Sequence, residues 1–425
     1  MKGRWVWGVS LASFVLAAGT GTYFRFALIH RLPGVLEYIR HAHSHLMFFS
    51  WITPPLMLLI GAHLRRRGLR TRAFGLAATI AVFSGLATYL PFLKSGYHLM
   101  SLGGGKPLPI SMFVSGFNGF AWFLFLFAYV VATWKVRRWP VLRLFDGALA
   151  LMVVASLAIG GLAFLGATGQ VQRPTMLALV EWFLTAFADG WFGLSVVGLA
   201  ARFSRPARLS RYPLGLLVWT LVAAIALRSA ARFAVAGPGW VWSGGIDAAT
   251  SALAALVWLV LVSVVWPPSE TAVPSLAGVT LWLRQIALAL LMLKGAVEFA
   301  GAPPAVRQWL FAAPLHILFL HAFLLGAVSF ALLFAVRSTW GPGVFRGTWA
   351  FVATVALMLA ALVTLTPVWP RAWAGPWALY ATAITSLGPA LVALLALFRL
   401  DLGYGTRATP PSAGATGPAQ TGPSV

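Results

Sequence analysis

Long apolar runs recur along the whole chain, separated by short stretches rich in Lys, Arg, Gly and Pro. Each run reaches about 20 residues, the length that an α-helix needs to cross the hydrocarbon core of a bilayer. The pattern predicts twelve spans, over residues 5–24, 41–64, 73–93, 110–134, 147–167, 175–199, 213–236, 245–266, 280–300, 314–336, 347–367 and 377–398. We therefore expect an all-α fold, a polytopic membrane bundle of about twelve transmembrane helices over residues 1–402.

The last residues, 403–425, break this pattern, because they are rich in Gly, Pro, Thr and Ala. Such a composition cannot bury enough apolar surface to offset the entropy of ordering. This segment is expected to be a disordered cytoplasmic tail.

Composition agrees with the membrane prediction. Of the 425 residues 60% are hydrophobic and only 9% charged, and the mean hydropathy is +0.86. These values are typical of polytopic membrane proteins. The chain has no cysteine, which excludes disulfides, iron–sulfur clusters and a thiolate-ligated haem.

The formal net charge of +23 could indicate a nucleic-acid partner. However, 19 of the 31 Lys and Arg residues lie in alternate loops and the two termini, whereas the opposite loops hold 8. Positive residues collect on the cytoplasmic side of membrane proteins. The charge distribution therefore predicts the orientation of the chain, with both termini on the cytoplasmic side of a bacterial inner membrane. It does not indicate binding to nucleic acid.

Histidines gather at the beginning of two of the apolar runs. His41, His43 and His45 precede the second run, and His316 and His321 begin the tenth. Both spans are even-numbered, so both clusters are expected at the outer face. A histidine near lipid is costly unless it holds a metal, a proton or a partner, and two such clusters could bind a haem between helices.

Helix geometry limits how these histidines can be combined. His41 and His45 share a helix face, whereas His43 points nearly the opposite way. At most two of the three can therefore serve one site. The heights above the inner arginines, at about 1.5 Å per residue, favour the pairing of His45 with His316.

Two families share short motifs with this chain. The stretch His43-Ser-His-Leu-Met-Phe-Phe-Ser-Trp-Ile-Thr-Pro54 resembles helix 2 of the haem–copper oxidase large subunit, and the stretch from His321 resembles its helix 10. In that subunit these helices supply the two ligands of the low-spin haem. Pro370-Arg371 resembles a Pro-Arg-Arg motif whose arginines pair with haem propionates.

NnrS-type membrane proteins, twelve-helix haem proteins linked to nitric oxide metabolism, are similar to the same segments. His41-Ala-His43 matches their His-Ala-His entry to an early helix. His321-Ala-Phe-Leu-Leu-Gly326-Ala327 matches a late His-Ala-x-x-x-Gly-Ala helix. The two branches stay open as alternatives.

The chain departs from the oxidases where those enzymes bind copper. Thr185 or Ala186 stands where the copper histidine of helix 6 would fall, and the seventh span has Arg228 and Arg232 but no histidine. An ordinary copper site needs imidazoles. The resemblance therefore implies a haem b near the outer face without the usual copper centre, and leaves catalytic residues unassigned.

The resemblance also implies the residues that hold the haem. His43 (or His45) and His321 (or His316) would be the axial ligands of the iron, and Arg371 would bind the propionates. Two histidine ligands suit electron transfer, and one would leave a position for nitric oxide or oxygen. An electron-donor protein or a respiratory complex is an expected partner.

Ionisable residues inside the spans allow a different function. Charges in the membrane cost several kcal/mol unless they are paired or hydrated. Carboxylate–arginine pairs between the sixth and seventh spans are the structural explanation. In the alternative hypothesis, a cofactor-free transporter, Arg228 and Arg232 bind an anionic substrate while Glu181 or Asp189 couples protons. A purely structural subunit of a respiratory complex is a third hypothesis.

Overall fold

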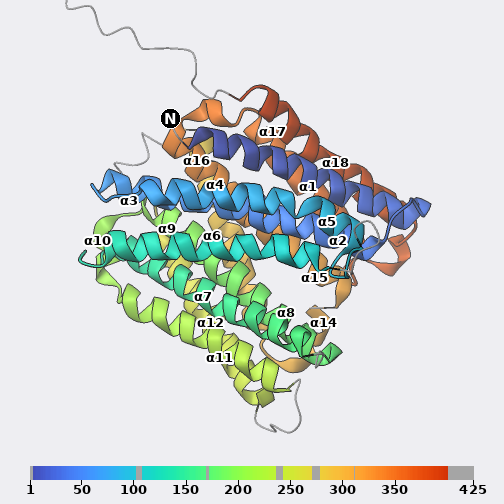
Figure 1. The fold of residues 1–425 in the computed structure, drawn as a ribbon, viewed down its shortest axis with the longest axis horizontal. Helices are drawn as coiled ribbons and strands as arrows, with labels where there is room; N and C mark the ends of the chain where they lie inside the picture. Colours follow the sequence, from blue (N-terminus) through green and yellow to red (C-terminus); the bar gives the residue numbers. More distant parts are fainter. Residues whose placement is uncertain are drawn as a thin grey trace, which may run out of the picture.

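A computed structural model describes residues 3–101, 108–168, 172–235, 243–269, 278–310 and 312–400. Long helices make up most of these residues and run roughly parallel or antiparallel to one another (Figure 1). Eleven of them are long and apolar enough to cross a membrane. An all-α, multi-pass membrane bundle is therefore confirmed, and the predicted tail, 403–425, lies outside the described residues.

The first half of the bundle contains α1 (Arg4–His30), α2 (Leu36–His45), η1 (Leu46–Ile52), α3 (Thr53–Arg66), α4 (Arg72–Ala87), α5 (Tyr89–Ser95), α6 (Ile110–Thr133), α7 (Pro140–Ala167), α8 (Arg173–Leu184), η2 (Thr185–Leu194), α9 (Ser195–Ala201) and α10 (Pro206–Arg211). The second half contains α11 (Leu214–Val235), α12 (Ser243–Val265), α13 (Val279–Ala300), α14 (Pro304–Leu310), α15 (Ala313–His321), η4 (Ala322–Val328), α16 (Ser329–Trp340), η5 (Pro342–Val344), α17 (Thr348–Val363), η6 (Arg371–Trp373) and α18 (Trp377–Phe398).

Two predicted boundaries need correction. The second long helix begins at Leu36, five residues before its predicted start at residue 41. The eleventh predicted span, 347–367, is the 16-residue helix α17, which ends at Val363. Threonines and Pro367 follow this end, and Pro disfavours helix in the residue before it. By length and composition, eleven helices and not twelve qualify as spans within the described ranges.

The two ends of the bundle differ in what they carry. Helices α2, α5 and α15 lie at one end, and α10 lies with the start of α1 at the other (Figure 1). The two histidine clusters therefore lie at the same end of the molecule, as their even-numbered spans predict. We call this the histidine end and the opposite one the arginine end.

Three of the long helices contain a π-helical segment, in which hydrogen bonds skip one more residue than in an α-helix. These segments are η1, η2 and η4, and all three have mostly buried side chains. Phe48 of η1 packs 5.5 Å from Phe192 of η2, and η2 contacts η4. The π-helical segments therefore meet in the core of the molecule.

Candidate functional site

His43 lies between α2 and α1, at a point where the two helices come unusually close. A Cβ atom added at Gly21 of α1 would stand 3.0 Å from His43 Cε1. The Nδ1 atom of His43 lies 2.8 Å from the carbonyl oxygen of Ala17, also on α1. Because a carbonyl oxygen can only accept, Nδ1 carries the proton and Nε2 keeps its lone pair.

His321 is the last residue of α15 and precedes η4 directly. Its Nδ1 donates to the carbonyl oxygen of Ile317 at 2.7 Å, so its Nε2 also keeps a lone pair. His321 lies within electrostatic range of both His43 and Arg25. The fold thus brings together two imidazoles from distant parts of the chain, each with its Nδ1 on a backbone carbonyl.

Arg25, on α1 four residues after Gly21, completes this group because it also acts electrostatically on His43. The group of His43, His321 and Arg25 is referred to below as the paired-histidine site. Sequence reasoning did not single out Arg25. The available signal was its position, as the first charged residue after the first apolar run.

His45 lies on a different side of α2. Its Nε2 shares a hydrogen bond of 3.1 Å with the Tyr97 hydroxyl, and its ring stacks on Phe92 with centroids 3.8 Å apart. Burial raises the pKa of Tyr97 to about 12, so the phenol stays protonated and donates to Nε2. His45 is therefore already engaged through the nitrogen that a metal would need.

His41 faces the same rings as His45, since it contacts Tyr97 and Phe92 and lies 3.5 Å from Glu37. The expectation that His41 and His45 share a face, with His43 on another, is confirmed. His316 lies within electrostatic range of Glu181 on α8. The pairing of His45 with His316, which the height comparison favoured, stays a prediction.

Arg371, the predicted propionate partner, is exposed in the short helix η6. Its side chain makes no hydrogen bond or ion pair with the described part of the chain. Arg25 is the arginine that the structure associates with both histidines of the paired-histidine site.

The ionisable residues inside the spans form a network of ion pairs. Arg228 donates to Asp189 at 3.3 Å, and Arg232 is paired with Glu181 and with Asp247. The predicted carboxylate–arginine pairs between the sixth and seventh spans are therefore confirmed.

Two cations that sequence reasoning left without a role complete this network. Lys294 of α13 lies 3.2 Å from Asp189 and 2.8 Å from Glu298, and its ammonium lies 5.0 Å from the centroid of Phe323. Arg307 of α14 is paired with Asp247. In these described pairs the cationic and acidic groups balance, which leaves no excess positive charge for the anionic substrate of the transporter hypothesis.

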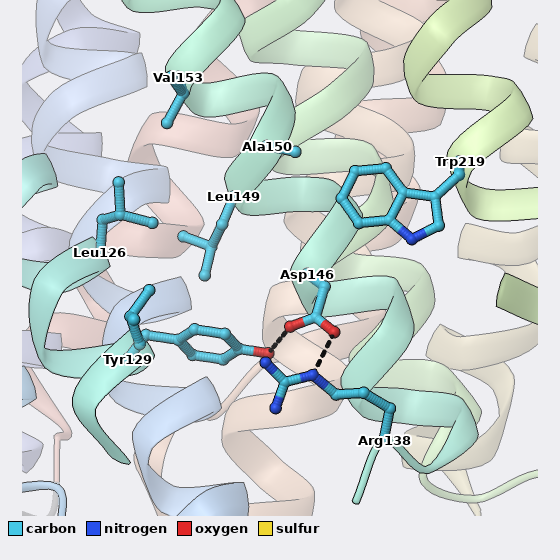
Figure 2. Close-up of a pocket in the computed structure, with 9 residues that line it drawn as sticks. Leu126, Tyr129, Arg138, Asp146, Leu149, Ala150, Val153 and Trp219 are labelled. Carbon is cyan, nitrogen blue, oxygen red and sulfur yellow. Dashed lines mark hydrogen bonds and ion pairs between the residues drawn. The ribbon is translucent and has the colours of Figure 1, made fainter. Parts of the chain in front are cut away.

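A separate pocket of about 360 Å³ opens at the side of the bundle between α6, α7 and α11. Figure 2 shows Tyr129, Asp146 and Arg138 at one end of it and mainly apolar side chains elsewhere. The Tyr129 hydroxyl donates to Asp146 at 2.8 Å, and Arg138 Nε lies 3.0 Å from the same carboxylate. None of the predicted site residues lines this pocket.

Comparison with known proteins supplies no family for this chain. A scan against protein-family models finds no match, and a search of curated proteins finds none either. The geometry of the paired-histidine site is therefore the basis for assigning a function.

Proposed function

We propose that this chain is an integral membrane haem protein that binds a b-type haem at the paired-histidine site for electron transfer. His43 and His321 would ligate the iron through Nε2, and Arg25 would bind the propionates. When bound, the haem supplies one-electron redox chemistry. The observation that carries the proposal is that His43 and His321 lie within electrostatic range of each other, each with its Nδ1 hydrogen-bonded to a backbone carbonyl.

The hydrogen bonds of the two imidazoles support this assignment. Histidines that ligate a metal almost always donate their other N–H to a carboxylate, a carbonyl or water, which fixes the tautomer and the ring orientation. His43 and His321 both have this arrangement. His45 does not, because Tyr97 occupies its Nε2.

The partial solvent exposure of the two imidazole rings is also consistent with binding of a ligand. Both side chains are surrounded by protein but keep some accessible surface, so each is half-buried. Each neutral imidazole, protonated at Nδ1, leaves Nε2 as an acceptor. An iron at Nε2 would satisfy it in each ring.

The positive charge of Arg25 would then have a clear role. A guanidinium binds a carboxylate bidentately and keeps its charge in a partly buried site. Arg25 would orient the haem through a propionate and offset its negative charge. The same segments carry the resemblance to haem–copper oxidases and to NnrS-type proteins, and neither branch is favoured by the geometry.

An absorption spectrum tests the proposal directly. We expect the detergent-purified protein to show a Soret band and to shift on reduction as a six-coordinate b-type haem does. His43→Ala and His321→Ala should each lose most of the haem, whereas the matched control His41→Ala should retain it. In the variant His321→Gly, imidazole added to the solution should take the place of the missing ligand and restore the low-spin spectrum.

Two results would refute the assignment. One is a colourless protein after expression with excess haem. The other is unchanged haem content in both His43→Ala and His321→Ala, with thermal unfolding like that of the wild type.

A further inference from the structure

A second group of unsatisfied polar atoms lies at the arginine end of the bundle, far along the same long helix from His43. His63, on the last turns of α3, is 6% exposed, and its Nε2 has no hydrogen-bond partner. Its ring packs against Trp139 and Phe145, with centroids 6.3 Å and 5.9 Å away. A buried ring nitrogen without a partner destabilises the fold and therefore calls for a physical reason.

Three arginines lie within electrostatic range of this histidine. Arg66, Arg67 and Arg202 all act electrostatically on His63, and Arg202 also acts on Arg66. The Arg67 guanidinium lies 5.3 Å from the centroid of the Trp139 ring. These residues come from the end of α3, the residue after α9 and the connection before α7.

Two more donors in this group have no partner. Arg202 Nη1 and Trp139 Nε1 are buried atoms without a hydrogen bond. Burial, and then the charge of Arg66, lower the pKa of Arg202 to about 10. Arg202 therefore stays cationic at neutral pH, and the repulsion between the arginines is not relieved by loss of a proton.

No acidic side chain neutralises this group among the described residues. The six described acids all have partners elsewhere, five of them in ion pairs with Lys or Arg and Glu37 in a hydrogen bond with His41: Glu37, Asp146, Glu181, Asp189, Asp247 and Glu298. Like charges held close together in a partly buried site destabilise the fold unless an anion binds between them. The imbalance is local, since the network around Asp189 is balanced.

We infer that His63, Arg66, Arg202 and Trp139 form a binding site for a phosphate-bearing anion at the arginine end. Arginine forks match the geometry of phosphate oxygens. The indole N–H of Trp139 and the N–H of a His63 tautomer protonated at Nε2 would add neutral donors. The phosphate would belong either to an anionic phospholipid headgroup or to a small soluble molecule. This inference does not depend on haem binding.

Thermal unfolding of the purified full-length protein tests the site, with two probes. The first is inorganic phosphate, compared with chloride at equal ionic strength. The second is a nanodisc of phosphatidylglycerol, compared with one of phosphatidylcholine. We expect at least one phosphate probe to raise the unfolding midpoint by about 2 °C or more, because a ligand that binds only the folded state stabilises it.

In Arg202→Gln, about tenfold more probe should be needed for the same rise in the unfolding midpoint, as expected for loss of one charged hydrogen bond. The matched control is Arg70→Gln, which removes an exposed charge from the same arginine-rich end. It should leave the response unchanged. If Arg202→Gln fails to fold, Arg66→Gln, at an exposed position, takes its place.

The outcomes separate the two sources of phosphate. A response to inorganic phosphate supports the site with a soluble ligand, and a response confined to phosphatidylglycerol supports it with a lipid headgroup. The absence of any shift with both probes would overturn the inference. An equal shift in Arg202→Gln and Arg70→Gln would overturn it as well, because the effect would then be one of general charge.

Discussion

At the scale of single residues, the state of Nε2 distinguishes the histidines of α2. His43 has its Nδ1 on a carbonyl oxygen and leaves Nε2 for a ligand, whereas His45 has its Nε2 on Tyr97. The two residues are two positions apart in the sequence and lie on different faces of the helix. A difference of two positions, about 200° around the helix axis, thus decides which imidazole remains available for a ligand.

Under the proposed function, the redox potential of the haem would separate the roles of Arg25 and Arg371. A positive charge close to the haem favours the reduced form, so Arg25→Gln should lower the midpoint potential by on the order of 50 mV. Arg371→Gln, which removes the arginine chosen from sequence, should leave the potential nearly unchanged. A spectroelectrochemical titration of both variants measures this, and the reverse result would show that Arg371 binds the propionates.

At the scale of the helices, the π-helical segments all end in the same way. Each is followed directly by a hydroxyl residue, Thr53, Ser195 or Ser329. Thr53 donates to the Phe48 carbonyl at 2.8 Å and Ser329 to the Leu324 carbonyl at 2.9 Å, in each case five residues back. The Thr53 and Ser329 hydroxyls satisfy carbonyls where the hydrogen-bond pattern changes, and so stabilise η1 and η4, the segments that follow His45 and His321. The Ser195 hydroxyl is buried without a partner among the described residues.

Ser329 has a second role, because Trp51 of η1 donates to its hydroxyl at 3.1 Å. We expect Ser329→Ala to destabilise the protein by about 1–3 kcal/mol, since a buried indole N–H loses its acceptor. Because η4 begins beside His321, the haem content should fall as well. The control is Ser338→Ala on the same helix, where the hydroxyl bonds only Ala335; an equal loss of stability in both variants would contradict the assigned role.

The buried ion pairs between helices also contribute to the stability of the bundle. Lys294 is 3% exposed at its side chain and holds both Asp189 and Glu298. Removal of one partner from a buried pair leaves an uncompensated charge and costs about 3–5 kcal/mol. Lys294→Met should therefore be strongly destabilising. Glu37→Gln, which breaks the exposed pair with His41, should cost less than about 1 kcal/mol.

Unfolding by a graded mixture of denaturing and mild detergents measures both variants. A small and equal effect of Lys294→Met and Glu37→Gln would mean that water reaches the Asp189 network. In that case the transporter hypothesis would regain support, since hydrated charges inside the membrane line many substrate paths.

At the scale of the whole molecule, the number of crossings decides where the end of the chain lies. Helix α17 has 16 residues, about 24 Å at the α-helical rise, which is short of the roughly 30 Å hydrocarbon core. Local thinning of the bilayer and interfacial residues can accommodate such a helix. We expect α17 to cross the membrane, because only then do α1 and α18 begin and end on the sides that the charges predict.

Single-cysteine labelling tests this topology, and the chain is suited to it because it contains no cysteine. Trp373→Cys, at an exposed position between α17 and α18, should react with an impermeant maleimide in intact cells. Arg70→Cys, at the arginine end, should react only after the membrane is opened. Protection of Trp373→Cys in intact cells would show that α17 does not cross.

Much of this fold could be predicted from the sequence, because bilayer thickness and helix periodicity act locally. Apolar run length located the long helices, and the 3.6-residue period separated the face of His43 from that of His41 and His45. The cost of an isolated charge in lipid predicted that Arg228 and Arg232 would be paired with carboxylates. These are consequences of short stretches of chain in a uniform solvent.

The tertiary structure alone decided which distant groups meet. The rotation and tilt of each helix depend on packing against its neighbours. A comparison of heights favoured His45 with His316, whereas the packed bundle brings His43 and Arg25 within electrostatic range of His321. Packing also decides the partners of Lys294, which pairs with Asp189 of η2 and Glu298 of α13, while Asp189 in turn pairs with Arg228. Local pattern determines that a helix forms and which residues share its face, and only the packed bundle determines what that face contacts.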